Sequence, residues 1–287
     1  MKIKETYKTK EKIMNNSLTE EQVKVLNMSQ SVINEVRKVI IGKDEIIIKV
    51  LLSILAGGHI LIEDIPGVGK TTLAVALSKA LSLDYKRLQF TPDVLPTDVT
   101  GFTILNKETH KFEYKQGAAL TNLFLADEIN RTSSKTQSAL LEVMEEGKVT
   151  VDGITHKMPD PYIVIATQNP VGSIGTQMLP ESQMDRFIVR LTMGYPNIES
   201  EVAMLKSKQN LVPVDNVRPV VSAEDILQAR KVVENIYVSD QVFQYIVMLA
   251  NATRNNEYIK LGLSPRGTIA PVSYTHLRAH ETSLHLV

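Results

Sequence analysis

The sequence contains no cysteine and no tryptophan, and only 5% of its 287 residues are aromatic. Without cysteine there is no disulfide, no thiolate metal site and no cysteine nucleophile. This absence favours a cytoplasmic location, although many secreted bacterial proteins also lack cysteine. Hydrophobic residues make up 43% of the chain, which is enough for a packed core, and the length suggests about one or two domains.

Net charge is also lacking, because 32 Lys and Arg balance 32 Asp and Glu. This balance excludes nucleic-acid binding through a globally basic surface, but not through a local basic patch. No segment reaches the ~18 consecutive apolar residues of a membrane span; Lys49 and Ser53, for example, interrupt the stretch 46–55. The lysine-rich residues 1–18 have no apolar stretch behind them, so we expect a disordered leader rather than a signal peptide.

Short apolar strands alternate with helical patterns along most of the chain. This order predicts an α/β fold with a mostly parallel sheet between helices. Two hairpins interrupt it, one around the polar turn 106–110 and one around Asp152-Gly153. Strands are predicted at 59–62, 86–90, 122–126, 162–166 and 187–191, and helices at 71–82 and 134–146, after two N-terminal helices that begin near Thr19 and Asp44.

The pattern changes after residue 195. Strands stop there, and helical periodicity continues at 199–209, 223–235 and 240–254. We therefore expect an α/β core over residues 19–195 and a smaller helical domain over 196–270.

The most informative motif runs from Asp64 to Thr71, between a predicted strand and a predicted helix. In a phosphate-binding loop, glycines such as Gly67 and Gly69 let backbone N–H groups approach a polyphosphate at a helix N-terminus. Lys70 would reach the β- and γ-phosphates, and Thr71 would bind Mg²⁺ through its hydroxyl. The strict pattern has glycine at the position of Asp64, so the alternative is a chance glycine-rich turn. The residues expected to bind the cofactor here are Pro66, Gly67, Val68, Gly69, Lys70, Thr71 and Thr72.

Two acids, Asp127 and Glu128, follow the apolar strand 122–126. At such a strand end an aspartate can hold Mg²⁺ through water, and the next glutamate can polarise the attacking water. Taken alone, the acids could equally cap the next helix. Together with the phosphate loop they favour hydrolysis over binding alone.

A polar cluster, 167–169, follows the next apolar strand. Asn169 could orient the lytic water from the end of that strand. The alternative is a simple turn, because Asn-Pro is a common turn pair.

These segments together resemble the AAA+ ATPases, and more closely the MoxR family within them. The resemblance covers residues 36 to 267, and its most specific parts are 88–101, 125–131, 166–170 and 179–187. It implies a P-loop NTPase core with parallel sheet, a partial all-helical lid, and ATP and Mg²⁺ as cofactors.

The resemblance also implies roles for single residues. Asn169 would be the first sensor residue, and Arg186 would be the arginine finger that completes the site of a neighbouring subunit. Arg266 would be the second sensor, carried on the lid. The main chain at Ile41 and Gly42 would face the adenine. From the sequence alone, Arg186 could equally form a surface ion pair with the preceding aspartate. Arg131 matches an arginine of the family, but we assign it no catalytic role.

Residues 271–287 depart from the family pattern, which continues after Arg266 with an Ala/Leu-rich helix. Pro271 interrupts any such helix, and three of the six histidines lie in this stretch. We expect a non-native tail, a translated assembly or adaptor sequence that replaces part of the lid. His276 and His280 have a spacing seen in zinc sites, but no third ligand is placed, so we assign no metal there.

The expected function is Mg-dependent ATP hydrolysis that remodels or matures a protein client. The resemblance implies a homo-hexamer and clients with von Willebrand factor A-like domains. One rival is an AAA+ DNA-associated motor, which a basic hairpin tip would favour; the tips here are mixed and acidic, so nucleic acid is not expected. A second rival is an ATP-binding scaffold with little turnover, if Arg266 lies on a lid fragment that cannot pack.

Overall fold

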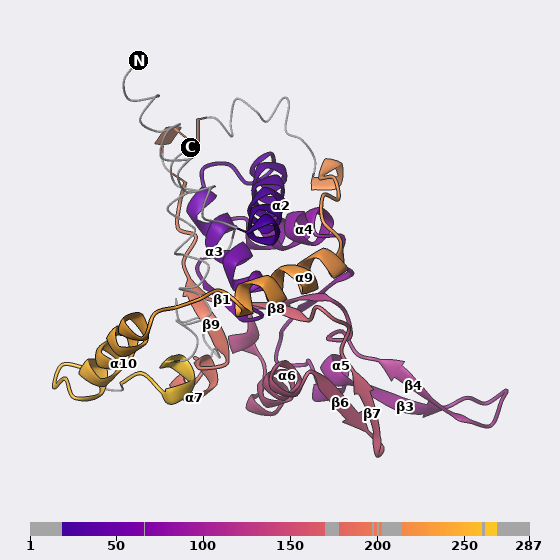
Figure 1. The fold of residues 1–287 in the computed structure, drawn as a ribbon. Helices are drawn as coiled ribbons and strands as arrows, with labels where there is room; N and C mark the ends of the chain where they lie inside the picture. Colours follow the sequence, from indigo (N-terminus) through magenta and orange to yellow (C-terminus); the bar gives the residue numbers. More distant parts are fainter. Residues whose placement is uncertain are drawn as a thin grey trace, which may run out of the picture.

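A five-stranded parallel sheet forms the centre of the molecule (Figure 1). The computed structural model describes residues 19–65, 67–169, 178–196, 198–199, 201–202, 214–259 and 262–268. The strand order is β2-β5-β8-β1-β9, with every pair parallel. The carboxyl ends of the strands therefore meet at one edge of the sheet. The strands are β1 (His59–Glu63), β2 (Tyr85–Gln89), β5 (Leu123–Asp127), β8 (Ile163–Gln168) and β9 (Phe187–Leu191).

Helices cover both faces of this sheet, which confirms the predicted α/β architecture. In β5, Leu123 and Leu125 join the core on one face, whereas Phe124 and Ala126 join the core on the other. Successive side chains of a strand point to opposite faces, so a strand buried on both sides must be apolar at every position. One face carries α2 (Glu20–Arg37), α3 (Asp44–Leu55) and α4 (Lys70–Ala80), and the other carries α5 (Pro96–Thr100) and α6 (Ser134–Glu146).

The helix ends follow from local sequence. Thr19 accepts a hydrogen bond from the backbone of Gln22 at 3.2 Å, and the Gln22 side chain accepts one from the backbone of Thr19 at 3.0 Å. This reciprocal capping box begins α2, as the sequence predicts. Ser133 caps α6, and Gly147, with φ of +60°, ends it.

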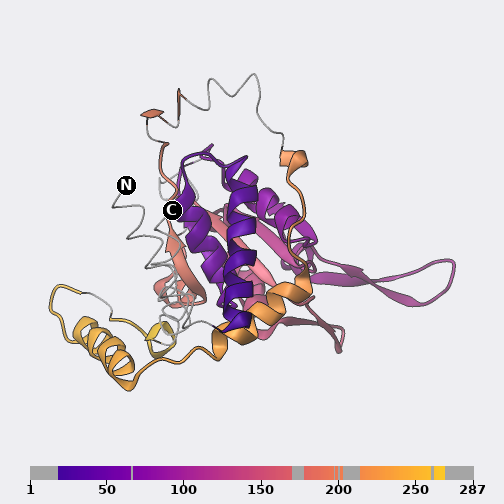
Figure 2. The same ribbon diagram turned by 45° about the horizontal axis from the view of Figure 1, so that its top comes forward.

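Both predicted hairpins are present and lie on the same side of the molecule. They are β3 (Gly101–Leu105) with β4 (Phe112–Gln116), and β6 (Lys148–Val151) with β7 (Ile154–Lys157). Figure 2 shows the β3–β4 hairpin extending away from the sheet. The ring of Tyr114 stacks on that of His156, with centroids 3.8 Å apart and planes at 14°, so the two hairpins support each other.

The region after β9 is helical. Helix α9 (Ala223–Glu234) packs against α2 and α3, and Arg230 donates from Nε to the carbonyl of Ile54 at 3.0 Å. Helix α10 (Asp240–Arg254) lies apart from the sheet in both views, and Ala250 is its one buried residue (Figures 1 and 2). Thus α9 shares the core of the α/β region, and the domain boundary at residue 195 stays a prediction.

Several predicted features fall outside the described residues. These are the leader 1–18, the tail 271–287 with His276 and His280, and most of the expected helix 199–209. Within the described part of the chain, no helix has both the length and the apolarity needed to cross a membrane. Short helices of the structure also include α7 (Glu181–Met184), η1 (Ile129–Arg131) and η2 (Val214–Asn216).

Candidate active site

The glycine-rich loop joins the carboxyl end of β1 to the first turn of α4. Gly67 and Gly69 have φ of +85° and +93°, a region that other residues rarely adopt. Gly69 is the N-cap of α4 and supplies no side-chain acceptor to the first turn. The first N–H groups of an 11-residue helix are therefore available to an anion, as a phosphate site requires.

Lys70 is buried at the first position of α4, where its Nζ donates to the carbonyl of Asp64 at 2.7 Å. Burial lowers the pKa of this ammonium, while the charges of Asp127, Asp64 and Glu128 act in the opposite direction. The Asp64 carboxylate accepts hydrogen bonds from the backbone of Ile65 and of Gly194. Aspartate at this position therefore ties the loop to the segment that follows β9.

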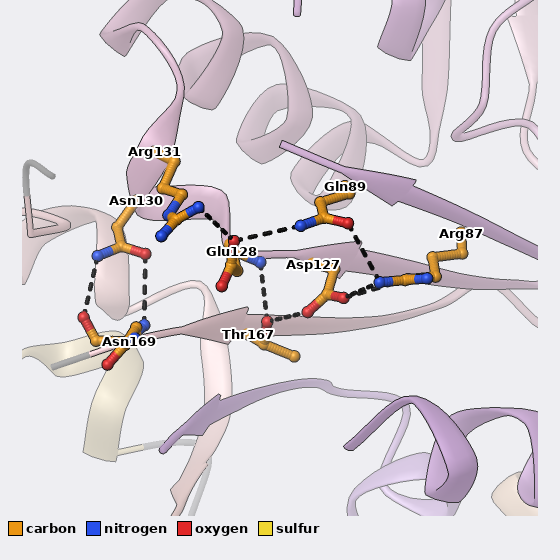
Figure 3. Close-up of polar contacts among 8 residues, drawn as sticks. All are labelled: Arg87, Gln89, Asp127, Glu128, Asn130, Arg131, Thr167 and Asn169. Carbon is orange, nitrogen blue, oxygen red and sulfur yellow. Dashed lines mark hydrogen bonds and ion pairs between the residues drawn. The ribbon is translucent and has the colours of Figure 1, made fainter. Parts of the chain in front are cut away.

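Asp127 ends β5, and hydrogen bonds fix both of its carboxylate oxygens (Figure 3). The hydroxyl of Thr167 on β8 donates to Oδ1 at 2.6 Å. Arg87 on β2 donates to Oδ2 from Nη2 at 2.7 Å and from Nε at 3.1 Å. The acid that the sequence assigns to Mg²⁺ is therefore held by its two neighbouring strands.

Glu128 is in the left-handed region, with φ of 57° and ψ of 47°. Its backbone N–H donates to the Thr167 hydroxyl at 2.8 Å, which supports this uncommon conformation. Its Oε2 forms an ion pair with Arg131 at 3.1 Å and accepts a hydrogen bond from Gln89 at 3.4 Å (Figure 3). These contacts hold the Glu128 carboxylate at the carboxyl end of β5, between η1 and β2.

Asn169 follows β8, next to the acids, and is buried. Its carbonyl accepts a hydrogen bond from Asn130 Nδ2 at 3.1 Å, and its N–H donates to Asn130 Oδ1 at 3.4 Å (Figure 3). This amide pair joins the end of β8 to η1. The placement fits a residue that orients water, but the role itself stays a prediction.

One pocket of about 360 Å³ brings together much of the predicted site. It combines the phosphate loop with both acids and with two residues that the sequence did not indicate, Arg87 and Gln89. Pro66 lies outside the described residues, and Val68 packs against the core. The pocket is lined by Gly67, Gly69, Lys70, Thr71, Thr72, Arg87, Gln89, Asp127 and Glu128.

Ile41 and Gly42 lie in the turn between α2 and α3. The next residue, Lys43, donates from Nζ to the carbonyls of residues 193, 194 and 195 at 2.6 to 3.1 Å. Because Gly194 also donates to Asp64, this turn and the phosphate loop are attached to the same segment. The predicted contact with adenine stays a prediction.

Arg186 and Arg266 lie at the other end of the sheet. Arg186 immediately precedes β9, whose first residue pairs with His59 at the start of β1. Both arginines bind Glu145 of α6, through Arg186 Nε at 3.0 Å and Arg266 Nη1 at 2.9 Å. Neither lines the pocket at the phosphate loop of its own chain. The structure thus does not bring Arg266 to that pocket, and its sensor role stays a prediction.

Comparisons with known proteins agree with this geometry. Residues 59–189 match the profile of the ATPase family associated with various cellular activities (AAA). The chain is 36% identical over 248 residues to the protein named Chaperone MoxR1 of Mycobacterium tuberculosis, covering 83% of this chain and 65% of that protein. The chain belongs to the MoxR family of AAA+ ATPases.

Two further relatives of this MoxR-family chain align over more of their length. The YeaC protein of Bacillus subtilis strain 168, described as uncharacterized, is 49% identical over 83% of this chain and 74% of its own. A crystal structure from Cytophaga hutchinsonii, of a protein provisionally described as an ATPase, has a TM-score of 0.83 and 38% identity. The match covers 91% of this chain and 82% of that one. The likeness confirms the P-loop AAA+ fold.

Nucleotide binding is a property of this family, and the pocket fits Mg²⁺ with a polyphosphate. Magnesium commonly takes one or two protein ligands and completes its shell with phosphate and water. Thr71 and Asp127 both line the pocket and are the residues that would hold the ion. No group of three or more His, Cys, Asp or Glu that could hold a metal occurs among the residues the structure describes.

Sequence reasoning assigned no role to four polar residues of this MoxR-family site, which are Arg87, Gln89, Asn130 and Thr167. Arg87 and Gln89 lie on β2 and Thr167 lies on β8, and these strands neighbour the acids only after the sheet forms. Asn130, in contrast, follows the acids two residues later in the chain. Thr167 belongs to the predicted polar cluster 167–169, but its contact with Asp127 carries no local signal. Arg87 carries no local signal either, because a basic residue in an edge strand is common.

Proposed function

We propose that this chain hydrolyses ATP in a Mg²⁺-dependent reaction and uses the energy to remodel or mature a protein client. The observation that carries the proposal is the placement of Lys70, Asp127 and Glu128 in one pocket at the carboxyl ends of β1 and β5. A glycine loop alone would support binding; the adjacent acid pair is what supports turnover.

Each residue has a defined part in the proposed reaction. The N–H groups of α4 and the Lys70 ammonium bind and orient the phosphates. Thr71 and Asp127 would hold Mg²⁺, which would neutralise charge on the phosphates. Glu128 accepts a proton from the attacking water, and Asn169 orients that water.

The ion pair with Arg131 bears on this role for Glu128. In the proposed reaction Glu128 turns from Arg131, which contacts its Oε2 at 3.1 Å, toward the attacking water.

The substitution Glu128→Gln tests the assignment. We expect ATP turnover to fall at least ~100-fold, because the amide cannot accept the proton, while nucleotide affinity changes little. Phosphate release would measure turnover, and a fluorescent ATP analogue would measure binding. The control is Glu142→Gln, an exposed residue of α6 outside the pocket. Unchanged turnover in Glu128→Gln would contradict the role of Glu128 as the base. ATP binding by the wild type without any turnover would favour the alternative function, an ATP-binding scaffold.

The client and the assembly belong to the same proposal. Similarity to the protein named Chaperone MoxR1 supports a protein client, and the family supports assembly, for which we propose a homo-hexamer. Clients with von Willebrand factor A-like domains remain the preferred class. The DNA motor gains little support, since the β3–β4 turn, 106–110, carries mixed charge. DNA binding with a steep salt dependence would reverse that preference.

A further inference from the structure

Arg87 places a second positive charge in the pocket, in addition to Lys70. It lies on β2, where the neighbouring Gln89 is in register with Asp127 of β5. Two of its nitrogens donate to a single oxygen, Asp127 Oδ2, at 2.7 and 3.1 Å. Its Nη2 also reaches Gln89 Oε1 at 3.3 Å. The guanidinium is therefore anchored to the acid that is assigned to Mg²⁺.

The two oxygens of Asp127 differ in how easily their partners can leave. Oδ1 is bound by Thr167, which is fully buried and also accepts the N–H of Glu128. Oδ2 is bound by Arg87, whose side chain is 41% exposed and ends a flexible stem. A cation that approaches from the pocket would therefore displace Arg87 more readily than Thr167.

We propose that Arg87 competes with the divalent metal for Oδ2 of Asp127. When the hydrated metal takes this oxygen, the metal supplies the positive charge and the guanidinium leaves Oδ2. When no metal is bound, Arg87 supplies part of the positive charge that the phosphates need. Arg87 thereby weakens the coupling between metal binding and nucleotide binding. This inference rests on the proposed function, since it assumes that the pocket takes a metal–nucleotide complex.

Arg190 provides a matched control for this idea. Its Nη1 pairs with Glu63 Oε2 at 3.5 Å, again between neighbouring strands, and its side chain is exposed. It does not line the pocket at the phosphate loop. Loss of Arg190 removes one cross-strand ion pair without changing the charge around Asp127.

The experiment measures the dissociation constant of ADP by calorimetry, once with EDTA and once with saturating Mg²⁺. The dissociation constant in EDTA divided by the dissociation constant in Mg²⁺ measures the coupling between metal binding and nucleotide binding. We expect Arg87→Gln to increase this ratio at least ~fivefold over the wild type, because ADP binds more weakly in EDTA without the guanidinium. The Mg²⁺ concentration needed for half-saturation should fall as well, because Arg87 no longer competes for Oδ2. Arg190→Gln should leave the ratio unchanged.

Arg87→Lys separates the charge from the hydrogen-bonding geometry. Lysine keeps the positive charge but cannot make the two-nitrogen contact, so we expect an intermediate ratio. If thermal melting shows that Arg87→Gln is unfolded, Arg87→Lys becomes the variant that tests the competition. A ratio in Arg87→Lys equal to or below that of the wild type would then contradict the competition.

Other outcomes separate this inference from the proposed function. ADP binding by every variant with an unchanged ratio in Arg87→Gln would overturn the inference alone. An equal change of the ratio in Arg190→Gln would also overturn the inference, because loss of any positive charge on the sheet would then produce the effect. No ADP binding by the wild type under either condition would overturn the proposed function, and the inference with it.

Discussion

His59 is a buried histidine at the start of β1 with both ring nitrogens in use. Its Nδ1 accepts the N–H of Val164 at 3.1 Å, so Nε2 carries the proton and lies 3.0 Å from the carbonyl of Met144. The ring also meets Tyr162 edge to face at 5.7 Å. Burial lowers the pKa of His59 to about 4. The neutral ring thus joins β1, β8 and α6.

This pKa predicts how stability depends on pH. Between about pH 6.5 and pH 4 the unfolded chain binds a proton at this residue while the folded chain does not, so stability is lost as the pH falls through that range. The loss from this residue is about 3 kcal/mol, since one pKa unit corresponds to about 1.4 kcal/mol. Urea unfolding at pH 7, 5.5 and 4.5 should show it in the wild type and show less of it in His59→Gln. The control His110→Gln, in the exposed β3–β4 turn, should behave as the wild type. If the stability of His59→Gln depended on pH as strongly as that of the wild type, His59 would not be the source of the loss.

The β3–β4 hairpin depends on close backbone packing at its base. A Cβ on Gly117 would lie 2.2 Å from the carbonyl oxygen of Val99 and 2.4 Å from the nitrogen of Gly101. The N–H groups of the next two residues donate to the carbonyls of Asp98 and Val99, which holds the two segments together. This close approach shows why the position needs glycine.

Gly117→Ala should therefore destabilise the protein by about 2 kcal/mol or more, because the clashing atoms belong to the main chain and cannot move alone. Gly267→Ala is the matched control: its Cβ would mainly meet the terminal methyl of Leu263, which can turn aside. Thermal melting of both variants tests the contrast. A similar melting temperature for Gly117→Ala and the wild type would contradict the argument.

At the scale of the whole molecule, the pocket and Arg186 lie at opposite ends of the sheet. The phosphate loop follows the carboxyl end of β1, whereas Arg186 lies beside its amino end, and a five-residue strand spans roughly 16 Å. Arg186 therefore cannot reach the pocket of its own chain without a large rearrangement. Glu145, which binds Arg186 and Arg266 together, positions both at a surface that a neighbouring subunit could meet.

If Arg186 acts on a neighbour, two inactive variants should complement each other. Arg186→Ala lacks the arginine but keeps its own Glu128, and Glu128→Gln lacks the base but keeps its Arg186. We expect each alone to be inactive, and an equimolar mixture to regain a measurable part of wild-type turnover. Wild-type activity per subunit should also rise with protein concentration. Arg190→Ala, which removes an exposed arginine of β9, should stay active. If the mixture regains no turnover and wild-type activity per subunit does not depend on protein concentration, Arg186 does not act on a neighbouring subunit.

The sequence by itself determined the alternation of strands and helices, the glycine-rich loop and the acid pair. These follow from local rules: strands buried on both faces are apolar throughout, and a phosphate loop needs glycine at Gly67 and Gly69 and a lysine at the helix start. Only the tertiary structure decided which side chains surround that site. Arg87 reaches Asp127, Asn130 binds Asn169, and Glu145 joins two arginines that are 80 residues apart, because strand order and helix packing bring together segments that no local pattern relates.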